Sequence, residues 1–338
     1  MKNLFHNKHV NKVLVTGANG FVGSNLVDYL AAHDIYVKCL VHHKDQLKWI
    51  NELQGKVEII VGDILEINSL KNAVQGVDIV FHLAGVVKSF QKKDFFCINV
   101  QGTENLLKAI ITYNPNLKRF LYMSSQSASG PSCDGKAVTE QDSCYPVSEY
   151  GRSKLEAEKK VLSYTDLIPV TILRPSSVYG PRDRDLFFLF DLINRGIMPF
   201  MGIRERFFNF CYIDDLIKAT TLASIHKHSI GQTYFIHSDG KFSLNQFIKL
   251  IVRSLNKKVI KLPIPFFLIK LYFLYNEFYA LISRNEKVFS RDKYKELKQY
   301  NWLCSIDKAK SEIGYTPDHL LKEGVSKSVQ WYKKQGWL

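Results

Sequence analysis

A tyrosine and a lysine stand four residues apart in the stretch SEYGRSK, at Tyr150 and Lys154. Four residues are about one helical turn, so a helix here would project both side chains from one face toward a shared ligand. An ammonium group beside a phenol favours the phenolate, which brings a pKa that is ordinarily about 10 toward neutrality and suits the phenol to proton transfer. Such a pair also arises by chance on a solvated helix, so it needs support from the rest of the chain.

The stretch VLVTGANGFVGSNL carries the strongest local signal. An apolar run, Val13 to Thr16, leads into Gly17, Gly20 and Gly23, and a helical pattern follows. Glycines at this spacing allow a tight turn, close approach of the backbone to a pyrophosphate, and close packing of helix on strand. The first N–H groups of the helix then offer donors and a positive dipole to phosphate. The stretch predicts a dinucleotide-binding turn.

Short apolar runs alternate with helix-like segments from residue 11 to about 175, which predicts parallel βαβ units. The expected strands are Lys12 to Thr16, Tyr36 to Val41, Val57 to Val61, Ile79 to Leu83, Arg119 to Met123 and Val170 to Leu173. The expected helices are Asn25 to Ala32, Gly102 to Thr112 and Ser148 to Ser163. This is the pattern of an α/β fold with a Rossmann-type, doubly wound parallel sheet that binds ligands at the carboxyl ends of its strands.

The alternation breaks down after Pro175, and the segment Thr233 to His237 is the last clear strand. From about Gly240 the chain has a mostly helical pattern. We therefore expect a dinucleotide-binding domain from residues 1–180 plus about 207–238. Residues 181–206 plus 239–338 would form a smaller, mostly helical substrate-binding lobe.

The composition limits the class of protein. Lysine and arginine number 46 and aspartate and glutamate 32, a net charge of +14, which favours anionic partners such as a phosphorylated cofactor or an acidic lipid surface. The basic residues follow no nucleic-acid-binding module, so nucleic acid is not expected as a partner. The six cysteines show neither a disulfide framework nor metal-ligand spacing. With no secretory apolar region at the N-terminus and no apolar run of about 18 residues, a cytoplasmic location is expected.

Basic residues follow the second expected strand. In VKCLVHHKDQ, the place where an acid would bind an adenosine ribose hydroxyl holds His42, His43 and Lys44. A basic cluster would instead bind a ribose 2′-phosphate, so NADP(H) is favoured and NAD(H) is an alternative. The three side chains also fit a solvated loop. Asp63, followed by Ile64, could accept from the adenine amino group or cap a turn.

Two further strands end in residues suited to this edge of the sheet. In FHLAGVV, Leu83, Ala84 and Gly85 suit a segment beside a bound cofactor, whereas the lone His82 is expected to be structural. In RFLYMSSQSASG, a hydroxyl such as that of Ser125 could hydrogen-bond a substrate oxygen, although serines after strands often form turns.

The order of these motifs resembles the extended short-chain dehydrogenases/reductases, also called the NAD(P)-dependent epimerase/dehydratase family. The matching residues are TGANGFVG (16–23), Asp63, HLAG (82–85), Asn99, SSQSASG (124–130), Tyr150, Lys154 and LRPSSVYGP (173–181). The resemblance covers nearly the whole chain. The stretches VTGANGFVGSNLVDYL and SGPSCDG are closest in style to the dihydroflavonol-reductase and 3β-hydroxysteroid-dehydrogenase branch.

The resemblance implies roles for particular residues. Ser125 would orient the substrate oxygen, Tyr150 would act as acid or base, and Lys154 would hold the nicotinamide ribose and lower the pKa of the tyrosine. Asn99 would support the active-site helix and a proton-relay water, or be an ordinary buried amide. The cofactor contacts expected are Gly17, Asn19, Gly20, Phe21, Val22, Gly23, His42, His43, Lys44, Asp63, Ile64, Leu83, Ala84, Gly85, Tyr150, Lys154, Pro175 and Val178. The substrate contacts expected are Ser125, Gln126, Ser127, Tyr179 and Phe208, and no metal is expected.

One departure from the family bears on the substrate. Sugar-nucleotide epimerases of this family hold the substrate diphosphate with an arginine at the position that Phe208 occupies here, counted back from Asp215. An aromatic side chain cannot neutralise a diphosphate. Arg206, two residues earlier, could compensate only with a change of register.

A second departure is the stretch PIPFFLIKLYFLYNEFYALI at residues 263–282. On a helical projection Lys270 and Glu277 share one face, and nearly all other positions are apolar or aromatic. Such a segment would be a buried lid, a dimer contact or a peripheral membrane contact.

Three functions remain open on the sequence. The favoured one is an oxidoreductase interconverting a ketone and a secondary alcohol on a small, apolar, lipid-like substrate, of the sterol or long-chain sphingoid 3-ketone type. The first alternative is a nucleotide-sugar epimerase or dehydratase that retains NAD. The second is a non-catalytic dinucleotide sensor, which the intact Ser125, Tyr150 and Lys154 disfavour. The family resemblance adds a homodimer as a further expectation.

Overall fold

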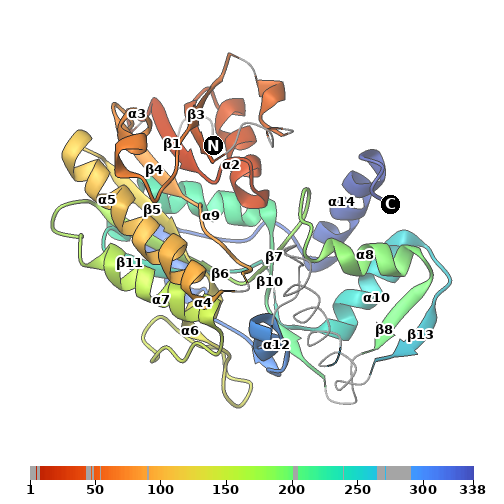
Figure 1. The fold of residues 1–338 in the computed structure, drawn as a ribbon. Coiled ribbons are helices and arrows are strands. Elements are labelled where there is room, and N and C mark those ends of the chain that lie inside the picture. The colour runs from red at the N-terminus through yellow and green to blue at the C-terminus, as the bar shows by residue number, and fades with distance from the viewer. Residues whose placement is uncertain are drawn as a thin grey trace.

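A seven-stranded parallel sheet forms the centre of the computed structural model (Figure 1). The structure describes residues 5, 8–42, 47, 49–53, 55–89, 91–200, 205–238, 240–264, 271 and 291–338. The strands, in their order across the sheet, are β11 (Gln232–Ile236), β6 (Val170–Pro175), β5 (Arg119–Met123), β4 (Ile79–His82), β1 (Lys12–Thr16), β2 (Tyr36–Val41) and β3 (Val57–Val61). The chain order reverses between β1 and β4, and a ligand crevice is expected at such a switch point.

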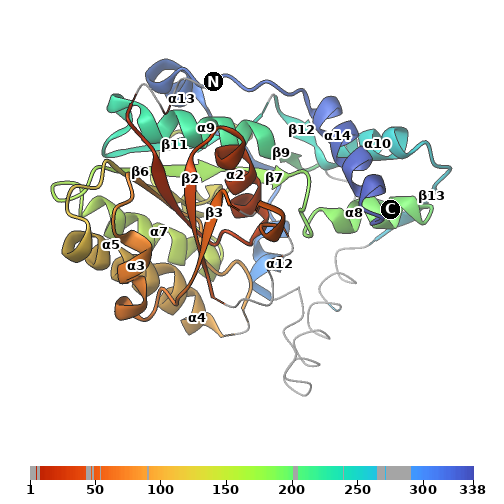
Figure 2. The ribbon, with the colours of Figure 1, turned by 90° about the horizontal axis from the view of Figure 1, so that it is seen from above.

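Helices cover both faces of this sheet, as Figure 2 shows. Side chains alternate along a strand, so Val13 and Val15 of β1 belong to one core cluster and Leu14 to the other. The helices of the first face are α2 (Phe21–Ala32) and α9 (Ile213–Ile225), and those of the second include α3 (Lys71–Val74), α5 (Gly102–Tyr113) and α7 (Glu149–Leu162). Shorter elements of this part are η2 (Asn51–Leu53), η3 (Ile67–Leu70), α4 (Lys92–Phe96), the π-helical turn η4 (Cys97–Gln101), α6 (Gln126–Ser129) and η5 (Lys227–Ser229).

The Rossmann-type fold is confirmed, and most of its elements begin and end where the sequence pattern predicts. The bounds of β1, β2, β3 and β5 agree residue for residue, while β6 extends two residues further, to Pro175. Helix α2 differs most, because it begins at Phe21, directly after the turn at Gly20, four residues before the expected start.

The remaining elements lie mainly toward the C-terminus. The small strands are β7 (Ser177–Tyr179) with β10 (Phe210–Tyr212), β8 (Ile197–Phe200) with β13 (Ile260–Pro263), and β9 (Phe207–Phe208) between β12 (Phe242–Ser243) and β14 (Asn301–Trp302). The helices are α8 (Phe187–Asn194), α10 (Leu244–Leu255), α12 (Arg291–Leu297), α13 (Asp307–Ile313) and α14 (Leu321–Lys334). The expected division into two domains stays a prediction, and α13, which it assigns to the smaller lobe, lies against β11.

Two expectations fall largely outside the described residues. Of the apolar segment 263–282, the structure describes residues 263, 264 and 271. Of the basic cluster after β2 it describes His42, while His43 and Lys44 lie outside. No helix within the described ranges is long and apolar enough to cross a membrane.

Candidate active site

The structure brings the three catalytic candidates to the carboxyl end of β5. Ser125 follows this strand as the N-cap of α6, Tyr150 lies in the first turn of α7, and the two side chains are close enough for the Ser125 hydroxyl to act on the pKa of Tyr150. Lys154 lies one turn further along α7, where its Nζ donates to the carbonyl oxygen of Met123 at 2.9 Å and sits 4.8 Å from the ring centroid of Tyr122. The convergence predicted from the motifs is therefore present in the fold.

Burial shifts the pKa values of Tyr150 and Lys154 in opposite directions. Burial raises the pKa of Tyr150 to about 12, although the hydroxyl of Ser125 lowers it. Burial lowers the pKa of Lys154 to about 8, opposed by the nearby charge of Glu158. Burial of the phenol is thus the largest effect on the pKa of Tyr150 in the free protein, and the lowering of that pKa by Lys154 stays a prediction.

A buried ion pair anchors α7 to the sheet just below this site. Glu158 lies one turn beyond Lys154 and accepts from Arg174 of β6 at 2.9 and 2.6 Å. Its Oε1 also accepts from Ser124 Oγ at 2.5 Å. All of these side chains are buried, so the pair fixes the helix that carries Tyr150 and Lys154 against β5 and β6.

Replacing Glu158 by glutamine is expected to lower the free energy of unfolding by about 3 kcal/mol or more, because Arg174 would keep its buried charge without a carboxylate. Denaturant unfolding measures the change. The control is Glu156→Gln in the same helix, which removes a surface pair with Lys159 and should cost less than about 1 kcal/mol. Equal losses in the two variants would contradict the role of the buried pair.

Asn99 ties the loop after β4 to α7. It lies in the π-helical turn η4 and is buried. Its Oδ1 accepts from the backbone N–H of Val86 at 2.8 Å, and its Nδ2 donates to the carbonyl oxygen of Val86 at 3.0 Å and to Ser153 Oγ at 2.9 Å. Both amide hydrogens are thus used inside the protein. These contacts agree with a supporting role, while the relay water stays a prediction.

The glycine turn after β1 has no room for side chains. Gly17 has φ of +66°, and a Cβ added there would lie 2.9 Å from the backbone nitrogen of Ala84. A Cβ at Gly23 would lie 2.1 Å from the carbonyl oxygen of Gly17. Helix α2 begins after Gly20 with neither a side-chain cap nor an acidic residue in its first turn. A close-packed turn before an uncapped helix N-terminus fits the pyrophosphate of a dinucleotide.

A buried hydrogen-bond chain fixes the segment that faces this turn. Thr16 Oγ1 accepts from the backbone N–H groups of Leu83 and Ala84 at 3.2 and 3.0 Å and lies 2.7 Å from His82 Nδ1. His82 Nε2 lies 2.9 Å from the hydroxyl of Thr103. Thr103 donates to the carbonyl oxygen of Asn99, so its hydroxyl must accept from Nε2–H. Burial lowers the pKa of His82 to about 3, and the histidine is structural, as expected.

The adenosine end of the expected site shows mixed contacts. His42 follows β2 and places its Nε2 3.4 Å from Asp63 Oδ2. Asp63 Oδ1 accepts from the backbone N–H of Leu65 at 2.9 Å, so the turn-forming alternative is present. Ile64 is buried against Gly102. Contacts of His42 and Asp63 with adenosine stay predictions.

One expected substrate residue belongs to the core, and this corrects the sequence analysis. Tyr179 is fully buried, and its hydroxyl donates to the carbonyl oxygen of Leu321 at 3.4 Å. A Cβ at Gly324 would lie 2.2 Å from that hydroxyl. Tyr179 therefore packs α14 against β7, and no surface remains for a substrate.

The other expected contacts are placed as follows. Gln126 is buried, Ser127 is half-buried in α6, and Phe208 is half-buried in β9. Asn19, Phe21 and Val22 lie half-buried at the glycine turn, Pro175 ends β6, and Val178 lies in β7.

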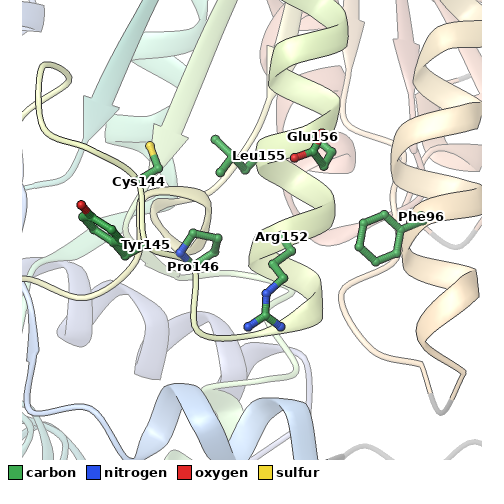
Figure 3. A pocket seen from close by; sticks show the side chains of 7 residues that line it. All are labelled: Phe96, Cys144, Tyr145, Pro146, Arg152, Leu155 and Glu156. Carbon is green, nitrogen blue, oxygen red and sulfur yellow. The ribbon is translucent and has the colours of Figure 1, made fainter.

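A surface pocket on the other side of α7 is not part of this cluster. Its volume is about 600 Å³, and its lining residues are Phe96, Cys144, Tyr145, Pro146, Arg152, Leu155 and Glu156 (Figure 3). Arg152 and Glu156 each follow Tyr150 and Lys154 by two residues in α7, so helical geometry places them on the opposite side of the helix. The pocket thus belongs to the outer surface of the helix.

Sequence reasoning missed a set of residues in α12. Asp292 and Glu296 accept hydrogen bonds from the residues that begin α7, including the backbone N–H of Tyr150 at 3.0 Å. They lie 142 or more residues away in sequence and follow no motif, so no local signal could have identified them.

The parallel sheet, the glycine turn at its switch point and the Ser–Tyr–Lys cluster at the same edge define a Rossmann-fold dinucleotide-dependent enzyme. The model of the NAD dependent epimerase/dehydratase family matches residues 13–236, and the chain belongs to this family of extended short-chain dehydrogenases/reductases.

The relatives of the chain differ in what they act on. It is 27% identical to a UDP-glucose 4-epimerase of Vibrio cholerae, covering 96% of each chain. It is 28% identical to a 3 beta-hydroxysteroid dehydrogenase/Delta 5→4-isomerase of Mycobacterium tuberculosis, covering 75% of this chain and 72% of the relative. The structure of UDP-glucuronic acid 4-epimerase from Bacillus cereus in complex with UDP-glucuronic acid and NAD superposes with a TM-score of 0.76 and 25% identity, covering 96% of this chain and 99% of that one. The protein is thus an enzyme of the NAD-dependent epimerase/dehydratase family, and its relatives do not determine its substrate.

Proposed function

We propose that the protein interconverts a ketone and a secondary alcohol with a nicotinamide dinucleotide, using Ser125, Tyr150 and Lys154. The observation that carries this proposal is that Ser125, Tyr150 and Lys154 lie together at the sheet edge that also holds the glycine turn. When bound, the dinucleotide supplies or accepts the hydride. The glycine turn would hold its pyrophosphate, and Lys154 would donate to its ribose hydroxyls.

The three side chains divide the proton chemistry. Ser125 donates to the substrate oxygen and holds it against Tyr150. In reduction Tyr150 gives its proton to that oxygen as hydride reaches the carbon, and in oxidation the phenolate takes the proton back. Lys154 stabilises the phenolate left by reduction. Because burial lowers the pKa of Lys154 to about 8, the ammonium can pass on a proton more readily than an exposed lysine.

An apolar, lipid-like ketone fits the residues around β9. Phe208 lies beside Trp302 and opposite Phe242 in the small sheet, and its ring centroid is 5.9 Å from that of Phe210. The guanidinium of Arg206 lies 5.0 Å from the ring centroid of Tyr300. An aromatic group at the position of a diphosphate clamp favours a substrate without a diphosphate, such as a sterol or a long-chain sphingoid 3-ketone.

A nucleotide-sugar epimerase or dehydratase is the second candidate. The charges of Glu296, Lys293 and Asp185 all act on the phenol of Tyr150, and Lys88 pairs with Asp185. A charged surrounding suits a hydroxyl-rich substrate better than an apolar one. The similarity to the epimerases of Vibrio cholerae and Bacillus cereus points the same way.

Cofactor and substrate classes can be separated by thermal stabilisation. We expect NADPH to raise the melting temperature more than NADH, through His42 and the basic residues that follow it, with no increase from a UDP-sugar. Turnover of a long-chain 3-ketone should accompany binding of NADPH. Phe208→Arg, which restores a cation at the clamp position, should create stabilisation by a UDP-sugar. Tightly retained NAD together with stabilisation of the wild type by a UDP-sugar would favour epimerisation instead.

A further inference from the structure

Helix α12 supplies a cap to the helix that carries Tyr150. Asp292 Oδ1 accepts from the backbone N–H of Glu149 at 2.7 Å, and Oδ2 accepts from that of Tyr150 at 3.0 Å. These are the first two N–H groups of α7, which have no carbonyl partner within the helix. One carboxylate from a distant part of the chain thus satisfies both.

Glu296 adds a second contact at the same helix end. Its Oε1 accepts from Ser148 Oγ at 2.8 Å, and Ser148 in turn caps the N–H of Gly151 at 2.9 Å. Its Oε2 pairs with Lys293 at 2.8 Å, and its carboxylate is buried. The first turn of α7 is therefore held by its own N-cap and by two carboxylates of α12.

This arrangement sets the position of the phenol. A helix N-terminus is usually capped by the residue that precedes it, and a carboxylate there is also favoured by the helix dipole. Here the residue whose N–H is capped from outside is Tyr150 itself. Any displacement of Asp292 would move the backbone from which the phenol reaches Ser125.

We propose that α12 is part of the catalytic apparatus, with Asp292 and Glu296 as positioning residues that hold the Tyr150 hydroxyl against Ser125, and with the Lys293–Glu296 pair setting the charge around that hydroxyl. The proposal rests on the proposed function of Tyr150 and adds to it a control exerted from the C-terminal region. Figure 1 shows α12 close to α6 and α7.

The charges around the phenol act in opposite directions. The side chains that act on its pKa are Ser125, the N-cap of α6, Lys293 and Glu296 of α12, and Asp185, which pairs with Lys88. Lys154 lies one turn further along α7, and the ring of Phe95 in α4 lies 6.3 Å from the ring of Tyr150. Of the α12 residues, Glu296 raises the pKa of Tyr150 and Lys293 lowers it. Neutral variants at these two positions should therefore change proton transfer with opposite signs.

The cap is tested by Asp292→Ala in the full-length protein. Amide hydrogen exchange at Glu149 and Tyr150 should speed up by about tenfold, because in the wild type the hydrogen bonds to Asp292 must break before these amides can exchange. We expect kcat to fall by about tenfold with dinucleotide affinity within about twofold of wild type. Asp292→Asn keeps one side-chain acceptor, so its exchange rates and its kcat should lie between those of the wild type and those of Asp292→Ala. Asp307→Ala, in the first turn of α13, removes an exposed carboxylate and should change neither quantity.

The effect of the α12 charges is tested by measuring the rate of alcohol oxidation as a function of pH. This rate rises with pH as the phenol of Tyr150 loses its proton and can act as a base. Lys293→Met removes a cation that favours the phenolate, so the rise should move to higher pH. Glu296→Gln removes an anion that disfavours it, so the rise should move to lower pH. If α12 had only a structural role, the pH at which the oxidation rate rises would move in the same direction in both variants or stay unchanged in both.

Unchanged exchange at Glu149 and Tyr150 in Asp292→Ala, or pH shifts that lack opposite signs, would overturn the proposal. The exchange measurement needs no substrate. If the wild type binds neither NADPH nor NADH, the proposed function fails, while the exchange comparison still decides whether Asp292 holds the helix.

Discussion

Replacing Tyr150 by phenylalanine is expected to lower turnover by about 100-fold or more, while the affinity for the dinucleotide stays nearly unchanged. The variant keeps the ring and its packing near Phe95 but removes the hydroxyl that gives and takes the proton. Ser125 keeps its hydroxyl for the substrate oxygen and loses its partner. Steady-state turnover and fluorescence titration with NADPH and NADH measure the two quantities.

A matched control is available five residues earlier. Tyr145 is exposed, so Tyr145→Phe makes the same chemical change outside the catalytic cluster and should leave turnover unaltered. Normal turnover in Tyr150→Phe would show that the phenol is not the proton donor and would remove the basis of the proposed function.

The second large effect is expected for Gly23→Ala. The added Cβ would lie 2.1 Å from the carbonyl oxygen of Gly17, a contact with backbone that no side-chain movement can relieve. Either the turn or the start of α2 must shift, so we expect dinucleotide affinity to fall by about 100-fold or more and stability to fall by about 1–3 kcal/mol. Calorimetric titration and thermal unfolding provide the measurements.

Gly76→Ala separates steric clash from backbone strain. Gly76 has φ of +67°, but nothing lies within 4 Å of an added Cβ. This variant should lose about 1–2 kcal/mol of stability through strain and keep its dinucleotide affinity. If Gly23→Ala binds the cofactor as tightly as wild type, the glycine turn does not hold the pyrophosphate.

The sheet and the convergence of Ser125, Tyr150 and Lys154 could be predicted because their signals are local. A strand buried on both faces is a short apolar run bounded by turn residues, and β1, β2 and β5 are of this kind, while the edge strand β3 is a similar apolar run that is only half-buried. The spacing of Tyr150 and Lys154 fixes their common helix face, and the carboxyl ends of parallel strands meet at one edge.

The features that were missed depend on burial and on contacts between distant segments. Tyr179 lies in a motif that suggests a role at the site, yet its ring packs against Phe210, Tyr212 and Phe247, which no local pattern relates to it. The direction of the pKa change at Tyr150 depends on how deeply the phenol is buried, which spacing cannot reveal. The cap from Asp292 joins residues that are brought together only by the tertiary fold.

The buried, hydrogen-bonded His82 next to the cofactor crevice does not become protonated when the medium becomes mildly acidic. With its pKa lowered to about 3, His82 remains neutral through the range in which exposed histidines become charged. The unfolded chain takes up this proton below about pH 6.5 and the native state does not, so acidification should erode global stability. Until the protein unfolds, the neutral His82 keeps its contacts with Thr16 and Thr103, so this part of the crevice wall does not change as the medium becomes mildly acidic.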